Sequence, residues 1–167
     1  MTTEPGEYVV GAYLKFILGC DVVDYNVREP VGGLIGLNEL DVLGLRFRDK
    51  TAYVCEVTTH TMGMNKAAEI KLPLKLKAQK EYAIKNLSDF QKIHYMIWSP
   101  KIQPKRLENI YKSNDLLDVE IIANERYLSA ICELNDFSKQ QKKDTNNPFV
   151  RFLQILNSSN SKFKIVV

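Results

Sequence analysis

Apolar and polar residues alternate along two neighbouring stretches of the chain, residues 37–47 and 52–59. Alternation of this kind puts successive side chains on opposite faces of an extended chain, so it predicts two β-strands. The polar segment between them, Arg48, Asp49 and Lys50, is of the kind that forms turns. We therefore expect an antiparallel pair whose turn is centred on Asp49 and Lys50.

The remaining pattern predicts helices mixed with strands. Helices are expected over residues 5–18, 64–87, 104–113, 124–137 and 146–157, and further strands over residues 21–29, 92–99, 118–123 and 161–167. A glycine-rich connection is expected over residues 30–38. Pro73 is expected to divide the second helix or to begin its second half, because proline is tolerated in a first turn and not in an interior. This order predicts one domain, residues 1–167, of the α/β class, with a mixed β-sheet flanked by helices on both faces.

Composition sets limits on this picture. The chain has 167 residues, 45% of them apolar, which is enough for one domain with a real core. No apolar run is long enough to cross a membrane and no signal peptide is recognisable, so a cytoplasmic location is expected. Three cysteines without a CxxC spacing indicate neither a zinc site nor a disulfide framework. The absence of G-x-S-x-G, P-loop and G-x-G-x-x-G sequences gives no support to a serine hydrolase or a dinucleotide-binding protein.

Acidic residues gather on one face of the predicted strand pair. With the expected turn, Leu43 lies opposite Glu56, Asp41 opposite Thr58, and Glu39 opposite His60, so Asp41 and Glu56 are diagonal neighbours about 7–8 Å apart at Cα. Two half-buried carboxylates repel one another unless a cation or a proton lies between them. Mg²⁺ suits such a pair, because it needs only one or two protein carboxylates and keeps several waters. The alternative is that these acids are surface residues paired with nearby Lys or Arg.

The segments "ELDV" and "YVCEVTT", joined by a turn and followed by a helix, resemble the PD-(D/E)XK nuclease superfamily, which has the restriction-endonuclease-like fold. The resemblance covers roughly residues 5–100 and implies a metal-dependent phosphodiesterase. It implies that Asp41 and Glu56 bind Mg²⁺, with Mn²⁺ able to replace it. Glu7, in the first helix, matches a place where many members carry another acid. Glu39 is either a further ligand or a charge at the rim.

The sequence departs from the family pattern at Thr58, where a lysine is usual two residues after the second acid. Three outcomes are open. A lysine of the following helix, Lys71, Lys75 or Lys77, reaches into the site. Alternatively, Thr58 binds the metal and His60 handles protons. In the third case the site is inactive and the chain is a binding module.

Basic residues provide a further expectation about partners. The net charge of +3 permits binding to nucleic acid without requiring it. The expected function is a metal-dependent DNA endonuclease that works as a homodimer or together with a DNA-recognition subunit. The alternative is an inactive module of the same fold that binds nucleic acid or a partner protein. The residues expected to contact nucleic acid are Lys71, Lys75, Lys77, Gln79, Lys101, Lys105 and Arg106.

Overall fold

The computed structural model describes residues 3–28, 39–60 and 62–158. The predicted glycine-rich connection and the predicted strand over 161–167 lie outside these ranges. The helices are α1 (Pro5–Ala12), α2 (Lys66–Asn86), α3 (Pro104–Lys112), α4 (Glu125–Gln140) and α5 (Pro148–Ser158). The π-helical turn η1 (Tyr13–Ile17) continues α1, and the short 3-10 turns are η2 (Phe47–Asp49) and η3 (Asn114–Leu116). The strands are β1 (Val22–Val27), β2 (Leu40–Arg46), β3 (Thr51–Val57), β4 (Lys92–Ser99) and β5 (Val119–Ala123).

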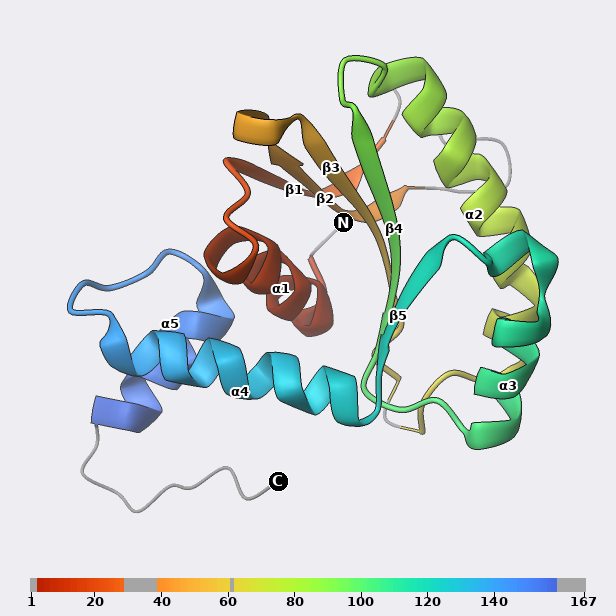
Figure 1. The fold of residues 1–167 in the computed structure, drawn as a ribbon. Helices are drawn as coiled ribbons and strands as arrows, with labels where there is room; N and C mark the ends of the chain where they lie inside the picture. The colour runs from red at the N-terminus through yellow and green to blue at the C-terminus, as the bar shows by residue number, and fades with distance from the viewer. Residues whose placement is uncertain (1–2, 29–38, 61, 159–167) are drawn as a thin grey trace.

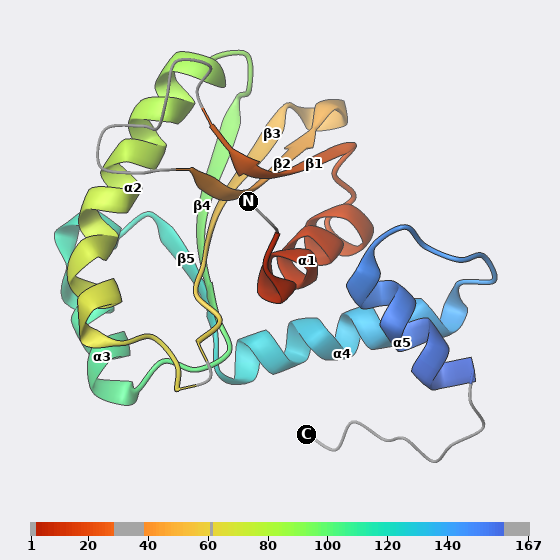
Figure 2. The ribbon, with the colours of Figure 1, turned by 180° about the vertical axis from the view of Figure 1, so that it is seen from behind.

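The five strands form one mixed sheet in the order β1-β2-β3-β4-β5. The β1–β2 and β2–β3 pairs are antiparallel, whereas the β3–β4 and β4–β5 pairs are parallel. Helices α1, α4 and α5 lie on one face of the sheet, and α2 and α3 lie on the other (Figures 1 and 2). The predicted class, α/β with a mixed sheet and helices on both faces, is confirmed.

Strand β4 shows how the sheet divides the core into two layers. Met96 and Trp98 belong to the apolar cluster under α1, α4 and α5, whereas Ile97, between them, packs with Leu72 and Leu76 of α2. This division follows from the alternation of side chains along a strand. Because both faces of β4 are covered, its C-terminal half is buried without interruption and includes three successive apolar residues, Met96 to Trp98, as is usual for a parallel strand buried on both sides.

The hairpin between β2 and β3 has a different register from the predicted one. Leu43 lies opposite Val54 and not opposite Glu56, so the predicted pairing is wrong by two residues. The cause is the position of the turn: η2 is followed by Lys50 in the left-handed conformation, with φ 49°, so the four-residue connection spans residues 47–50, one residue earlier than predicted, and the ladder starts at Arg46 and Thr51. A shift of two residues keeps every side chain on its predicted face.

Helix α2 passes through Pro73 without a break, so the expected division of this helix is wrong. The helix begins well before the proline, because the side chain of Asn65 caps it by accepting a hydrogen bond from the main-chain N–H of Ala68 at 2.9 Å. Leu72 and Leu76, one turn apart on either side of Pro73, are both buried against the sheet. Tertiary packing therefore holds the helical conformation on both sides of the proline, as it commonly does.

Two of the three cysteines, Cys20 and Cys55, are buried, Cys132 is partly exposed, and all three are free thiols. Burial raises the pKa of Cys20 to about 11, so this thiol stays protonated at neutral pH. Within the described residues, none of the helices combines the length and the apolar character that crossing a lipid bilayer demands.

Candidate active site

The predicted acids line a cavity of about 400 Å³ between the N-terminus of α1, the adjoining ends of β2 and β3, and the first half of α2. The sequence-predicted residues that the structure gathers around this acidic cleft are Glu7, Glu39, Asp41, Glu56, Thr58, His60, Lys71 and Lys75. They come from elements that are far apart along the chain. The sheet and its two helical layers therefore bring carboxylates and lysines from distant parts of the sequence together around one cavity.

Helix α1 reaches the cleft because a glycine lets it approach closely. A Cβ atom on Gly6 would lie only 2.0 Å from Cγ2 of Thr59, just beyond the end of β3. The first turn of the helix is closed by a capping box in which the main-chain N–H of Glu4 donates to Oε2 of Glu7 at 3.0 Å. The cap fixes the Glu7 carboxylate at the N-terminus of the helix, where it also experiences the charge of Asp41.

Asp41 and Glu56 face each other across the β2–β3 ladder. Val42 lies opposite Cys55, and the same register continued by one residue sets Asp41 directly opposite Glu56. Glu56 is 2% exposed, and Asp41 accepts a hydrogen bond from the main-chain N–H of Val57 at 2.7 Å. The prediction that the two acids share one face of the sheet as neighbours is confirmed, with a closer pairing than expected.

The electrostatics of this pair show that the nearby positive charge does not fully offset its negative charge. Burial, followed by the charge of Glu56, raises the pKa of Asp41 to about 7. Burial also raises the pKa of Glu56, although the nearby Lys75 ammonium and Gln79 amide oppose this effect. A further cation or a proton beside Asp41 would therefore relieve the repulsion between the two carboxylates.

Lys75 of α2 is the lysine that contacts Glu56. Its ammonium group forms an ion pair with Oε1 of Glu56, while Nε2 of Gln79, one turn later on α2, donates to Oε2 of Glu56 at 3.1 Å. Burial lowers the pKa of Lys75, but the combined attraction of Glu56, Asp41 and Glu39 raises it above the ordinary value. Lys75 is therefore held as a cation.

The other two candidate lysines of α2 lie differently. Lys71, one turn before Lys75, is exposed and lines the cleft. Lys77 is exposed but does not line it, because two residues along a helix turn a side chain by about 200°. Of the three lysines that the sequence left open, the structure places Lys75 against the acids, Lys71 at the rim and Lys77 on the outer side of the helix.

Thr58 and His60 follow β3 and form one wall of the cleft. Thr58 is 8% exposed, and its main-chain N–H donates to the carbonyl of Trp98 at 2.9 Å, which continues the alignment of β3 with β4. His60 is exposed, and its carbonyl accepts from the N–H of Gly63 at 2.7 Å. The threonine hydroxyl and the imidazole are thus both beside the space that the acids face.

Glu39 is less available than Glu7 for a ligand role. Its carboxylate pairs with the Arg28 guanidinium at 2.8 Å, an arrangement typical of a charge at the rim. Glu7 is 8% exposed, and burial raises its pKa, with Asp41 adding to the rise and the Glu4 N–H opposing it. Among the described residues, no three His, Cys, Asp or Glu side chains meet closely enough to form a metal-binding group.

The donor set nevertheless fits Mg²⁺. Asp41 and Glu56 supply carboxylate oxygens, the ligands this ion prefers, and the adjoining cavity leaves space for the waters it keeps. The raised pKa of Asp41 marks the place where positive charge is most needed. The fit rests on two carboxylates, with Glu7 as the nearest additional acid on α1.

The three remaining basic candidates lie away from the acidic cleft. Lys105 and Arg106 lie on α3 and line a separate cavity of about 350 Å³ between α2 and α3, where Arg106 pairs with Glu69 at 2.9 Å. Lys101 is exposed in the connection before α3. The structure therefore separates the predicted nucleic-acid contacts: two line the cleft, three lie on α3 or just before it, and Lys77 lies on the outer side of α2. Gln79 is fully buried against Glu56, so it is not exposed to a nucleic acid as predicted.

Sequence reasoning missed Asn26. The register of β1 and β2 pairs Tyr25 with Val42 and Val27 with Leu40, so Asn26 lies opposite Asp41. Its φ of 54° is a left-handed conformation near the C-terminal end of β1, and its Nδ2 donates to Oε2 of Glu7 at 3.2 Å. Asparagine tolerates this conformation better than other side chains. An Asn inside a valine-rich strand was the only sequence signal.

Comparisons with known proteins supply no family for this chain: no family model matches it, and neither a curated protein nor a solved structure matches it. The functional assignment therefore depends on the geometry of the cleft.

Proposed function

We propose that this protein is a metal-dependent DNA endonuclease with a restriction-endonuclease-like fold, in which Asp41 and Glu56 bind Mg²⁺. The single observation that carries the proposal is the meeting of these two carboxylates with Lys75 at the edge of a cavity. Two acids from adjacent antiparallel strands, with one lysine, are the set that the resemblance to the PD-(D/E)XK superfamily implies.

The topology supports the same proposal. The resemblance implies a helix, a three-stranded antiparallel meander, a second helix and a fourth strand. Helix α1, strands β1 to β3, helix α2 and strand β4 follow in that order, and β4 joins the meander in parallel beside β3. The acids lie on the second and third strands of the meander, where the superfamily carries them.

In this proposal each side chain has a defined task. A bound Mg²⁺ lowers the pKa of a water molecule and offsets the charge that develops on the phosphate. Asp41 and Glu56 hold that ion, while Gln79 and Lys75 fix the Glu56 carboxylate from α2. Because Lys75 is held as a cation, it orients water and offsets negative charge but does not accept a proton.

The remaining tasks belong to the wall and the rim of the cleft. The proton of the attacking water passes to a group other than Lys75, and the His60 imidazole is the candidate beside the cavity, where the Thr58 hydroxyl can serve as a further metal ligand. Lys71, exposed at the rim, provides positive charge for a phosphate next to the one being cleaved. Cleavage of both strands of a duplex needs two such sites, so a second copy or a partner subunit completes the reaction.

The experiment uses purified protein and supercoiled plasmid, with Mg²⁺, with Mn²⁺ and with EDTA. Nicking that requires the metal, and that Asp41→Asn and Glu56→Gln each reduce at least 100-fold, is the expected result. Lys75→Ala should reduce nicking to a similar degree, whereas Lys85→Ala, exposed further along the same helix and away from the cleft, is the matched control and should leave it unchanged. Equal nicking by the Asp41→Asn variant and the unaltered protein would contradict the proposal.

One observation favours the alternative, an inactive nucleic-acid-binding module of the same fold. Both carboxylate oxygens of Glu56 already have partners, Lys75 and Gln79, which satisfy the acid without a metal. In that case the plasmid binds with an affinity that falls as salt rises, no nicking occurs in Mn²⁺, and Mg²⁺ leaves the thermal unfolding temperature unchanged. These three results together would replace the enzymatic proposal.

A further inference from the structure

Helix α2 carries large apolar side chains on the side that faces away from the sheet. Ile70, Leu74 and Ile84 are 65%, 65% and 77% exposed, whereas Leu72 and Leu76 are buried on the opposite side of the same helix. A surface helix is normally polar on its outer side. Single exposed apolar residues are ordinary, but a group of them on one face marks a contact surface. The outer side of α2 therefore has the composition of an interface.

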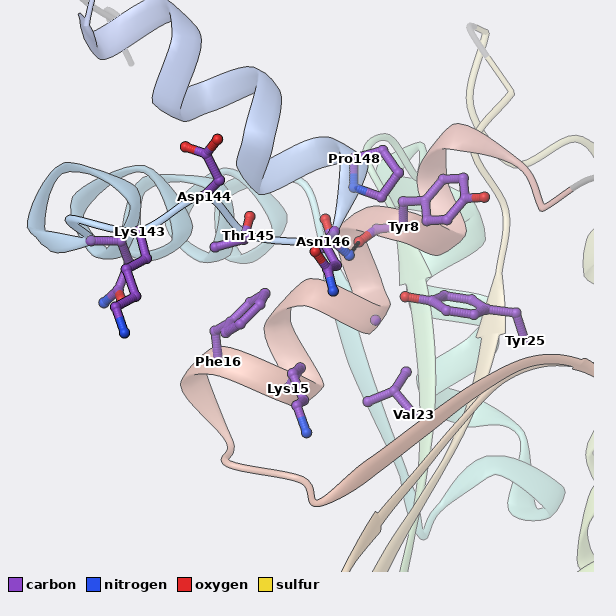
Figure 3. Close-up of a pocket in the computed structure, with 13 residues that line it drawn as sticks. Tyr8, Lys15, Phe16, Val23, Tyr25, Lys143, Asp144, Thr145, Asn146 and Pro148 are labelled. Carbon is purple, nitrogen blue, oxygen red and sulfur yellow. Dashed lines mark hydrogen bonds between the residues drawn. The ribbon is translucent and has the colours of Figure 1, made fainter.

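The helical layer on the other face of the sheet is closed by the chain itself. There the connection between α4 and α5 lies beside α1, and together with β1 they enclose a cavity of about 480 Å³ (Figure 3). Asn147 ties this connection to the helix by donating to the main-chain carbonyl of Tyr8 at 3.0 Å. Helix α3 contacts α2 along one flank, where Arg106 pairs with Glu69, and the apolar side chains on the outside of α2 stay exposed.

The exposed positions on this side of α2 follow a seven-residue repeat. Residues 70, 74, 77, 81 and 84 are separated by four, three, four and three residues, and all five side chains are exposed. This is the spacing of the positions at which two helices of a coiled coil meet. We call these residues the outer row; they are Ile70, Leu74, Lys77, Glu81 and Ile84. A pair of opposite charges thus lies at the centre of the row, with apolar residues on both sides.

The outer row is complementary to itself when two copies of α2 run antiparallel. Leu74 and Ile84 lie five residues on either side of position 79, and Lys77 and Glu81 lie two residues on either side of it. A two-fold axis beside position 79 places Leu74 opposite the partner's Ile84 and Lys77 opposite the partner's Glu81. Because the axis repeats every contact, each of these pairs occurs twice. The same surface of both copies thus supplies apolar contacts and two pairs of opposite charge.

The two charges select this arrangement over its neighbours. An axis beside position 77 would set Ile70 against the partner's Ile84, but it would also set Lys77 against the partner's Lys77. A parallel pair in register would place Lys77 and Glu81 each against its own copy. Like charges opposite one another disfavour such pairings. A charged layer in the seam of two helices fixes register in this way at some cost in stability.

From the exposure, the repeat and the charge pattern we infer that a second copy of this chain docks on the outer row, so that two α2 helices form an antiparallel pair about a two-fold axis beside position 79. The outer row is about 21 Å long, at about 1.5 Å per residue, so the helix pair alone makes a small interface. Small interfaces belong to weak, reversible assemblies, and the dimer dissociates on dilution. Among the described residues that line the acidic cleft, none belongs to the outer row, so the inference stands without the proposed nuclease activity.

The test is sedimentation equilibrium of the full chain in EDTA, without DNA, from micromolar to millimolar concentration. The average mass should rise with concentration toward twice that of one chain. Leu74→Glu and Ile84→Glu should each weaken self-association by about tenfold or more, because each would bury unpaired carboxylates in the seam. Ile155→Glu, which changes an exposed apolar residue of α5, is the matched control and should associate like the unaltered chain. Circular dichroism shows whether each variant keeps its fold.

Charge variants test the antiparallel pairing. Lys77→Glu and Glu81→Lys should each weaken self-association, because either change sets like charges opposite one another. An equimolar mixture of the two variants should associate, since one brings two acids to the seam and the other brings two lysines, and the double variant should recover self-association. A chain that stays monomeric at every concentration, association that neither Leu74→Glu nor Ile84→Glu weakens, or a mixture that associates no better than its components overturns the inference.

The result is separable from that of the nuclease experiment, because self-association is measured without metal or DNA. Asp41→Asn, which disables the acidic cleft in the proposed function, should associate as the unaltered chain does. A chain that dimerises through the outer row but never cuts DNA supports this inference and counts only against the nuclease proposal. A chain that nicks plasmid but remains monomeric at millimolar concentration counts only against the dimer.

Discussion

The Asn26 side chain donates an amide N–H to the Glu7 carboxylate at 3.2 Å, and this contact joins the C-terminal end of β1 to the first turn of α1. Asn26 keeps a φ of 54° to make it, a backbone conformation that is costly for most residues and that often marks a functional position. The contact fixes one oxygen of Glu7, the acid that α1 contributes to the lining of the acidic cleft.

Two substitutions separate the conformation of Asn26 from its side chain. Asn26→Gly keeps the left-handed backbone without strain, so the free energy of unfolding should change by less than about 0.5 kcal/mol. Asn26→Ala adds strain and should lower it by about 1 kcal/mol. Both variants lose the amide, so both should weaken Mg²⁺ binding, measured by calorimetry, by the same factor of about 3–10. If only the alanine variant binds Mg²⁺ more weakly, the contact with Glu7 has no role in metal binding.

Removal of Lys75 leaves a buried acid without its partner. Lys75→Met should lower the free energy of unfolding by about 1–2 kcal/mol in urea titrations at pH 7, because Glu56 is almost fully buried. The loss is at the low end for a buried pair, since about a third of the Lys75 side chain is exposed. The double variant Lys75→Met with Glu56→Gln should recover at least half of the loss. A double variant as unstable as Lys75→Met alone would show that packing of the lysine stem, and not charge, accounts for the effect.

The raised pKa of Asp41 predicts how stability depends on pH in EDTA. The folded-state pKa is about 7 and the ordinary value is 3.8, so the folded protein binds more protons than the unfolded chain between these two values. The contribution of Asp41 to stability is therefore greatest below pH 4 and is lost as pH rises toward 7. Asp41→Asn should flatten this part of the curve of unfolding free energy against pH.

The same group predicts the effect of Mg²⁺. A divalent ion beside Asp41 favours the ionised form, so Mg²⁺ should stabilise the protein more at pH 8 than at pH 5. Thermal unfolding with and without excess Mg²⁺ at the two pH values measures this difference. Asp41→Asn is the control and should show an equal, small shift at both. A larger stabilisation at pH 5 would contradict a metal site at Asp41.

Gly6 controls how closely α1 approaches the cleft. Gly6→Ala places a Cβ atom within 2.0 Å of Thr59 Cγ2, so either α1 or the segment after β3 must move. We expect a loss of about 1–3 kcal/mol in unfolding free energy and weaker Mg²⁺ binding. Adding Thr59→Ala, which removes the atom in closest contact, should restore part of both. Unchanged stability of the Gly6→Ala variant would mean that the helix is not held at this distance.

The sequence predicted the class, the strand pair and the shared face of Asp41 and Glu56, because period-two alternation is local and survives a two-residue error in register. It did not predict that Lys75, among three lysines, meets Glu56, since that choice depends on how α2 is rotated by the burial of Leu72 and Leu76. The conformation of Asn26 depends on α1 approaching β1. The continuity of α2 through Pro73 reflects packing that proline propensity does not include.

The position of Lys75 has a consequence for how such sites are recognised. The ammonium that meets Glu56 is supplied by a helix nineteen residues further along the chain, and not by the strand that carries the acid. A sequence motif that requires a lysine two residues after the second acid does not match a chain in which the lysine comes from a helix. When a functional side chain comes from a neighbouring element instead of the usual one, the arrangement of chemical groups can stay the same although the sequence no longer matches the motif.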